Sequence, residues 1–340
     1  MKRARGLSLL ELMIAMTLGL VVVLGVTTVF LGSKQGYRVQ ESTSRLQENA
    51  RFAMDLLSRE IRHADFWGGA TPAFIRRYSS SLASVGAPCT ESWMADVDNA
   101  VEAWAGTASS PLAGCTVQNY VPNTDVLVVR FADPAEYMRT AALPDIDGTN
   151  GRLILRARVG RDGILFDWRD HAEIVTPAPL VEDGAEPPAP DAPGAFPGDE
   201  STGVLTYRLG GRVLFVRTNP AGTPAIYVRQ PDSSVSGVSN STELVEGVEM
   251  MRLQFGIDED GDAVVNRYVS TADMRDTDWA STLIVRAALI VRGDALDDFA
   301  DDNTYTLPDG YEYTPAAADQ RFLRRLFVQD IQLRNRLDRS

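Results

Sequence analysis

An uninterrupted apolar segment near the start constrains this chain more than any other feature. From Leu12 to Leu31 the sequence contains neither a charged residue nor a proline. About twenty apolar residues in a helix are enough to cross the hydrocarbon core of a membrane. The residues before Leu7 include three lysine or arginine residues, and positively charged flanks stay on the cytoplasmic side. The sequence therefore predicts one membrane-spanning helix, with the rest of the chain in the periplasm.

Two ordinary explanations of this segment compete with a more specific one. A secretory signal would need a cleavage site with small residues after the apolar run. The residues there are Phe30-Leu-Gly-Ser-Lys34, and the run is too long for a typical signal core. An uncleaved signal anchor would fit the apolar run equally well. Glu11 favours something more specific, because a carboxylate at the edge of a membrane span costs roughly 2–3 kcal/mol unless a partner compensates it.

Glu11 follows Gly6 at the spacing of a processing signal. The basic leader, Gly6, the hydrophobic Leu7, Glu11 and the apolar run together resemble the class III signal of type IV prepilins. This resemblance implies that a prepilin peptidase cleaves between Gly6 and Leu7 and that the new amino terminus is methylated. Family members usually have phenylalanine where this chain has Leu7. The resemblance also implies that the Glu11 carboxylate pairs with the amino-terminal ammonium of a neighbouring subunit, which neutralises both charges in the filament core.

The apolar run is predicted to continue as an amphipathic helix beyond the membrane. No proline occurs before Pro72, so one helix can extend from near Leu7 to about Ala64. Arg51 with Asp55, and Asp55 with Arg59, are spaced to pair on its outer face. The following apolar residues recur at spacings of three and four: Val39, Leu46, Ala50, Ala53, Leu57, Ile61 and Ala64. The predicted segments are a leader (1–6), a membrane and filament-core segment (7–31) and an amphipathic continuation (32–65).

The remaining residues, 66–340, predict a β-rich periplasmic body. Strand-like runs occur at Asp125–Phe131, Arg152–Val159, Ile164–Trp168, Val204–Leu209, Val213–Arg217, Ala225–Arg229, Met250–Ile257, Leu283–Val291 and Phe322–Leu333. Turn signals at Asp162-Gly163, Gly210-Gly211 and Asp260-Gly261 separate several of them. Residues 176–199 are acidic and rich in proline, which predicts an exposed loop. The predicted fold class is α+β, with an antiparallel sheet packed on a long N-terminal helix.

The chain has two cysteines, Cys89 and Cys115. Their spacing does not match any zinc-binding motif. With only His63 and His171 in the chain, a Cys/His metal site is disfavoured. In an oxidising compartment a disulfide is the simplest interpretation, and it would contribute roughly 3 kcal/mol by constraining the unfolded chain. Two unpaired buried thiols are the alternative.

Two later segments resemble a narrower family. Leu244–Phe255 with Asp258–Asp262, and then Arg324–Asn335, resemble parts of PilW-type minor pilins. The resemblance implies a minor pilin that promotes type IV pilus assembly at or near the tip. Its implied partners are other minor pilins, the major pilin, a tip adhesin, the prepilin peptidase and the inner-membrane assembly platform. A J-type pseudopilin of type II secretion is the alternative within the class, and a membrane-anchored module that binds a periplasmic ligand or adhesin is the alternative from another class.

One motif offers ligands for a metal ion. Asp258, Asp260 and Asp262, with Gly261 between them, resemble the start of a calcium loop, because alternating aspartates supply oxygen ligands. Position twelve of such a loop is Val269, where an EF-hand has glutamate. A hairpin turn with a solvated acidic tip explains the same residues. Calcium is the one cofactor that the sequence suggests.

Composition excludes several other functions. The chain has 33 basic and 46 acidic residues, a formal net charge of −13, which disfavours a nucleic acid partner. Lysine occurs only at Lys2 and Lys34, so the lysines of P-loops and Schiff-base enzymes are missing from the body. The sequence also contains no Gly-x-Ser-x-Gly, His-Glu-x-x-His or Gly-x-Gly-x-x-Gly motif. We therefore expect a structural protein without enzymatic activity.

Overall fold

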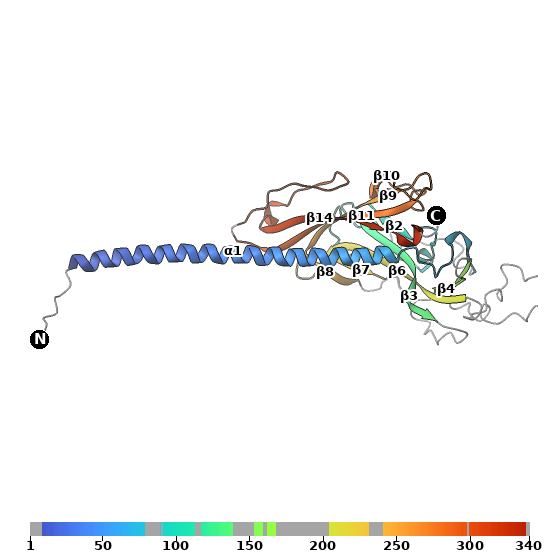
Figure 1. Cartoon of the computed structure of the whole chain (residues 1–340), viewed down its shortest axis with the longest axis horizontal. Coiled ribbons are helices and arrows are strands. Elements are labelled where there is room, and N and C mark those ends of the chain that lie inside the picture. Colours follow the sequence, from blue (N-terminus) through green and yellow to red (C-terminus); the bar gives the residue numbers. More distant parts are fainter. Residues whose placement is uncertain are drawn as a thin grey trace, which may run out of the picture.

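The computed structural model describes residues 9–78, 89, 91–112, 117–138, 153–158, 162–167, 204–230, 241–297 and 299–337. Its longest element is α1 (Leu9–His63), a single helix of 55 residues. The first half of α1 projects alone, and the second half lies along the body (Figure 1). The absence of proline and the continuous helix-forming sequence explain why no break occurs between the two halves.

A large, eight-stranded sheet forms one side of the body. Its strands are β1 (Ile75–Arg77), β2 (Val101–Trp104), β3 (Val126–Met138), β4 (Leu153–Arg158), β5 (Gly163–Asp167), β6 (Val204–Thr218), β7 (Pro224–Arg229) and β8 (Thr242–Glu246). The order is β1-β5-β4-β6-β3-β2, and β7 and β8 continue from the far part of β6. The pairings are antiparallel except β1 with β5, which is parallel.

A smaller sheet of four strands lies on the other side of α1. Its strands are β9 (Val248–Ile257), β10 (Arg267–Ser270), β11 (Thr282–Ala295) and β14 (Phe322–Gln332), in the order β10-β9-β11-β14. The short hairpin β12 (Tyr305–Thr306) and β13 (Glu312–Tyr313) covers part of its outer face. Smaller helical elements are α2 (Glu91–Met94), α4 (Arg334–Leu337) and three 3-10 turns at Pro72–Phe74, Thr271–Asp273 and Ala317–Asp319.

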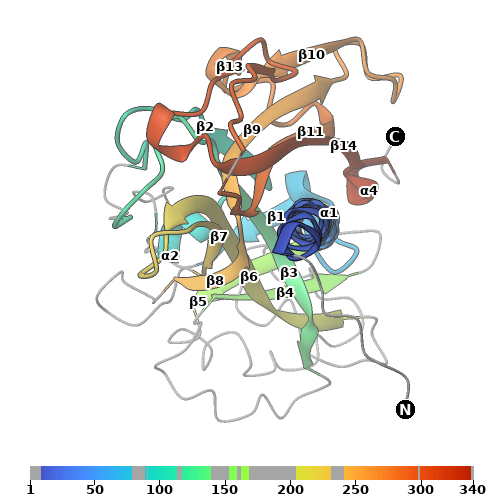
Figure 2. The same ribbon diagram turned by 90° about the vertical axis from the view of Figure 1, so that its left-hand side faces the viewer.

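The second half of α1 lies between the two sheets. Viewed along the helix axis, the small sheet lies above α1 and the large sheet below it (Figure 2). One core joins the helix to both: Leu46, Leu57 and Ile61 pack with Phe131 of β3 and Leu289 of β11. A second core covers the opposite face of the large sheet, where Trp67, Trp93 and Leu112 are among the residues that pack on it. The predicted α+β class, a long helix packed on β-sheets, is confirmed.

The helix buries more than the predicted stripe. Of the predicted residues, Leu46 to Ala64 are buried, whereas Val39 lies before the body and stays exposed. Ser42, Met54, Leu56 and Ser58 are buried as well, because the second sheet covers another side of the helix. The expected ion pairs of Asp55 do not form in the described helix, where Arg45 pairs with Glu41 and Arg59 with Glu60.

The predicted turn at Gly210-Gly211 was wrong, because β6 continues through both glycines. Gly210 lies opposite Phe131 in the neighbouring strand, and a Cβ there would come within 2.9 Å of its ring. A Cβ on Gly211 would come within 1.4 Å of the Met94 side chain. Here the glycines make room for large side chains from above and below the sheet, and they do not serve to reverse the chain.

Candidate assembly surfaces

The exposed half of α1 is one candidate site. Every side chain from Leu9 to Glu41 is exposed, and among the described residues α1 is the one helix long and apolar enough to cross a membrane, by length and composition. Its few polar groups are satisfied locally, because Thr17 and Thr27 donate their hydroxyls to carbonyls one turn back. A Cβ added at Gly19 or Gly25 would meet no atom within 4 Å, so no described part of the chain covers these positions.

Glu11 lies in the first turn of α1, where the positive end of the helix dipole favours a carboxylate. Gly6 and Leu7, the predicted cleavage residues, lie outside the described part of the chain. The role of Glu11 in pairing with a neighbouring amino terminus therefore stays a prediction. So does the segment division at residues 6, 31 and 65, although the described helix runs without interruption through the boundary at 31 and ends at His63, close to the last one.

The C-terminal residues Asn335 and Arg336 form hydrogen bonds at the C-terminal end of α1. Asn335 donates its amide to the carbonyls of Arg62 (3.2 Å) and Ala64 (2.8 Å), which have no intrahelical donor at a helix end. Arg336 is buried and donates Nε to Oδ2 of Asp65 at 2.8 Å. The other Asp65 oxygen accepts the indole N–H of Trp67 at 2.6 Å. The helix end, the loop after it and the last strand are thereby joined.

A single glycine carries the chain from one sheet to the other. Gly247 separates β8 of the large sheet from β9 of the small one, with φ of +84°. Its N–H donates to the carbonyl of Pro224 at 2.8 Å, and its own carbonyl accepts from Arg292 N at 2.7 Å. A Cβ at this position would come within 2.8 Å of the Arg292 carbonyl. Both the conformation and the close approach require glycine.

A buried charge network supports the outer face of the small sheet. The Glu249 carboxylate accepts from Arg324 Nε at 2.5 Å and from Arg292 Nη1 at 3.1 Å. Tyr313 donates its hydroxyl to the same carboxylate at 2.9 Å, and Tyr305 donates to Asp301 at 2.9 Å. Burial, followed by the neighbouring carboxylates, raises the pKa of both tyrosines above the ordinary value. The network holds the β12–β13 hairpin on β9 and β14.

Asp125 joins the two sheets. It is fully buried just before β3 and accepts from Leu253 N of β9 at 2.8 Å, from the Thr271 hydroxyl at 2.7 Å and from Gly106 N at 2.9 Å. Arg252 Nη1 lies 3.2 Å from it. Burial raises the pKa of the Asp125 carboxyl above its usual range, although Arg252 and the hydrogen bonds oppose the shift. Nothing in the sequence pattern marks this residue beyond its place at the start of a predicted strand.

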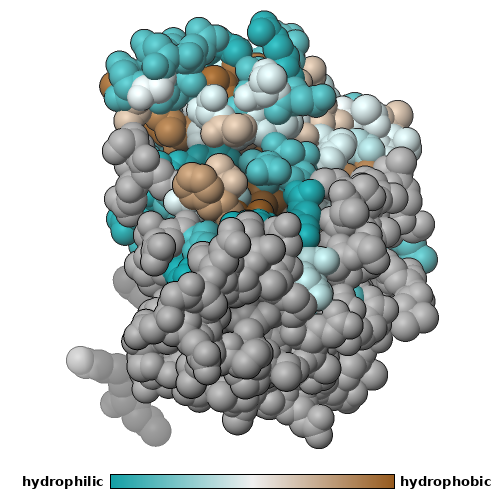
Figure 3. All heavy atoms as spheres, turned by 90° about the vertical axis from the view of Figure 1, so that its right-hand side faces the viewer, coloured by the Kyte–Doolittle hydropathy of each residue, from teal (hydrophilic) through white to brown (hydrophobic). Residues whose placement is uncertain are grey.

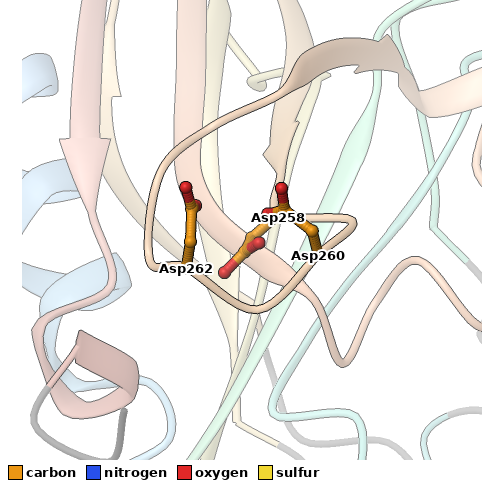
Figure 4. Close-up of side chains that lie close together, drawn as sticks. All are labelled: Asp258, Asp260 and Asp262. Carbon is orange, nitrogen blue, oxygen red and sulfur yellow. The ribbon is translucent and has the colours of Figure 1, made fainter.

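The structure brings the three predicted calcium ligands together. Ligand oxygens of Asp258, Asp260 and Asp262 all lie within 4.8 Å of one another at the turn between β9 and β10 (Figure 4). Both Asp258 oxygens already accept backbone N–H groups, from Gly261 at 2.7 Å and Ala263 at 2.9 Å. Desolvation opposes the shift, but the hydrogen bonds together lower the pKa of Asp258 below its usual value. This pattern is that of an aspartate-stabilised turn.

Calcium binding by this loop stays a prediction. Val269, at the twelfth position, is buried in β10 and offers no ligand. Seen from the end remote from the N-terminus, the coloured surface of the small-sheet lobe is largely hydrophilic (Figure 3). A solvated acidic tip is consistent with that surface.

Cys89 is buried and is not a free thiol. Its predicted partner Cys115 lies outside the described residues, so the pairing of the two stays a prediction.

Of the two histidines, His63 packs its ring against Phe131, with 5.6 Å between the ring centroids, which supports a packing role. His171 and the proline-rich stretch 176–199 also lie outside the described residues.

Two family models match separate parts of the sequence. The family model described as type IV pilus-assembly protein W (PilW) matches residues 213–335, and the model of the prokaryotic N-terminal methylation motif matches residues 1–27. The chain therefore contains one segment similar to the PilW family and, at its start, a methylation motif. None of the curated proteins matches the sequence significantly.

A solved structure of a type IV-like pilin from Thermus thermophilus is similar at 11% identity, with a TM-score of 0.34, over 86% of this chain and 97% of that one. The segment matched by the PilW model can be located in the structure. It begins in β6 and ends in α4, so it contains the sheet crossover at Gly247, the Glu249–Arg324 pair and the helix-capping Asn335. These residues join the two sheets and α1, and they are what sequence reasoning could not assign.

Proposed function

We propose that this chain is a minor pilin of the PilW type that primes or promotes type IV pilus assembly and lies at or near the pilus tip. A prepilin peptidase first removes residues 1–6 by cleavage between Gly6 and Leu7, and Leu7 is then methylated. The protein is held in the inner membrane by α1 with its body in the periplasm, and it later enters the pilus. Its partners are other minor pilins, the major pilin, a tip adhesin and the assembly platform.

One observation carries this proposal. The apolar half of α1 is exposed on all sides and overlaps the matched methylation motif, while the other half packs between two sheets. An apolar helix surface of this length needs lipid or other helices around it. The same segment can therefore serve first as a membrane anchor and then as part of a filament core.

The test is Glu11→Ala in the full-length chain, with Glu48→Ala as the matched control. Glu48 is an exposed glutamate on the same helix, within the body half. Without Glu11, a neighbour's ammonium stays unpaired in an apolar environment, so we expect incorporation into sheared pili to fall at least about a hundredfold. Mass analysis should find both variants cleaved after Gly6. Normal piliation of the Glu11 variant would contradict the proposed mechanism.

A deletion strain separates the competing functions. Loss of pili and of twitching supports the minor pilin. Failed secretion of exoproteins with normal pili would point to a J-type pseudopilin of type II secretion. Normal pili with lost adhesion would point to a binding module that is anchored but not polymerised.

A further inference from the structure

The last strand of the small sheet has an open edge. β14 pairs with β11 and with no other strand in the described part of the chain. It is 11 residues long, and Val328 in its middle is 47% exposed. An edge of this length presents unpaired N–H and carbonyl groups that can add a further strand. Figure 2 shows β14 as the outermost strand of the upper sheet, next to α1.

A groove runs between this edge and the enclosed half of α1. It has a volume of about 430 Å³, and its walls come from the helix on one side and β14 on the other. Ala50 and Met54 of α1 and Phe327 of β14 give it an apolar floor. Apolar surface beside a free strand edge is the arrangement that binds an extended peptide, because main-chain hydrogen bonds and side-chain burial act together.

The border of the groove is positively charged. Arg51 and Arg325 line it. Both arginines are exposed, and neither forms an ion pair within the described residues. Asp55 is the one acidic residue that lines the groove. By contrast, Arg324 and Arg336 of the same C-terminal segment are buried and paired with carboxylates.

We propose that the β14 edge and this groove bind an extended, acidic strand from a neighbouring pilin subunit. The strand continues the small sheet beyond β14, places apolar side chains over Met54 and Phe327, and presents carboxylates to Arg51 and Arg325. Carboxylates fit because guanidinium groups bind them in paired hydrogen bonds. The partner is a pilin subunit only if the chain enters pili, so this inference rests on the proposed function.

The test places a photo-crosslinking residue, p-benzoylphenylalanine, at Val328 of the full-length chain in piliated cells. The matched control carries the same residue at Val264, which is 58% exposed in the β9–β10 loop. We expect the Val328 position alone to crosslink a pilin subunit, through a peptide that contains aspartate or glutamate. Crosslinking to nucleic acid, to no partner, or equally from both positions would overturn the proposal.

Charge reversal gives the second measurement. Arg51→Glu with Arg325→Glu should lower the Val328 crosslink roughly tenfold, because like charges then face the partner's carboxylates. Arg275→Glu, an exposed arginine on another loop, is the control and should leave the yield unchanged. All of these positions are exposed, so an unchanged unfolding temperature verifies the fold. Normal entry into pili without a Val328 crosslink would refute this docking site alone, whereas failure to enter pili would refute the proposed function.

Discussion

The two halves of α1 share one backbone geometry and differ in what surrounds them. From Leu9 to Glu41 every side chain is exposed, whereas from Ser42 onward one face of the helix is buried between two sheets. The first half is apolar on all sides from Leu12 to Leu31, and the second half is amphipathic. An apolar surface that no described part of the chain covers is suited to contact with lipid or other helices. Stability of the body therefore depends on the second half of α1, and the assembly proposed above depends on the first.

The largest expected effect comes from truncating the enclosed half. Leu57 is fully buried between the sheets, so Leu57→Ala should lower the free energy of unfolding by about 2–5 kcal/mol. Leu24→Ala makes the same substitution in the exposed half and should alter the free energy of unfolding by less than about 0.5 kcal/mol. Urea unfolding of the two full-length variants in detergent measures both. Equal losses would mean that the halves are not independent.

Two glycine substitutions, one beside the second half of α1 and one within its exposed first half, should have smaller effects than Leu57→Ala. Gly293 of β11 faces α1, and a Cβ there would come within 2.4 Å of the Ser42 hydroxyl and 3.0 Å of its carbonyl. Gly293→Ala should therefore cost about 1–3 kcal/mol of unfolding free energy. Gly25→Ala meets nothing within 4 Å, so it should leave the body unchanged and act only on assembly. Thermal unfolding and piliation of each variant test this separation.

The smallest expected effect is a pH dependence of stability that comes from Asp125, the buried residue that joins the two sheets. Burial raises the folded pKa of Asp125 above the unfolded value of about 3.9. Between the two pKa values the folded state binds more protons, so the contribution of Asp125 to stability falls as pH rises through that window.

In Asp125→Asn this titration is absent. The stability difference between the parent chain and the variant should therefore shrink as pH rises from about 4. Urea unfolding across this range measures it. A constant difference would show that the Asp125 pKa is the same in both states.

Local patterns predicted much of the fold. The helix was expected to about Ala64 and ends at His63, and the strand expected at Ala225–Arg229 is found at Pro224–Arg229. Strong periodicity and turn residues act over a few residues, so the sequence displays them directly. The short strands β2, β8 and β10 were missed, because four or five residues carry too little pattern.

The contacts that join the two sheets and α1 could not be predicted from local patterns. Glycine reads as a turn signal, yet Gly210 and Gly211 lie inside β6 because Phe131 and Met94 need the space. Arginine reads as a surface residue, yet Arg324 is buried against Glu249. In both cases the deciding neighbour is distant in sequence.

The amino-acid sequence alone predicts the long helix, its apolar half and the methylation motif, because hydrophobicity and the absence of proline are properties of a continuous segment. Only the tertiary structure decided which faces of the second half are buried and which charges are paired. Arg324 meets Glu249 across 75 residues, and Arg336 meets Asp65 across 271. A charge can be buried only where such a partner compensates it, and the folded chain alone provides that partner.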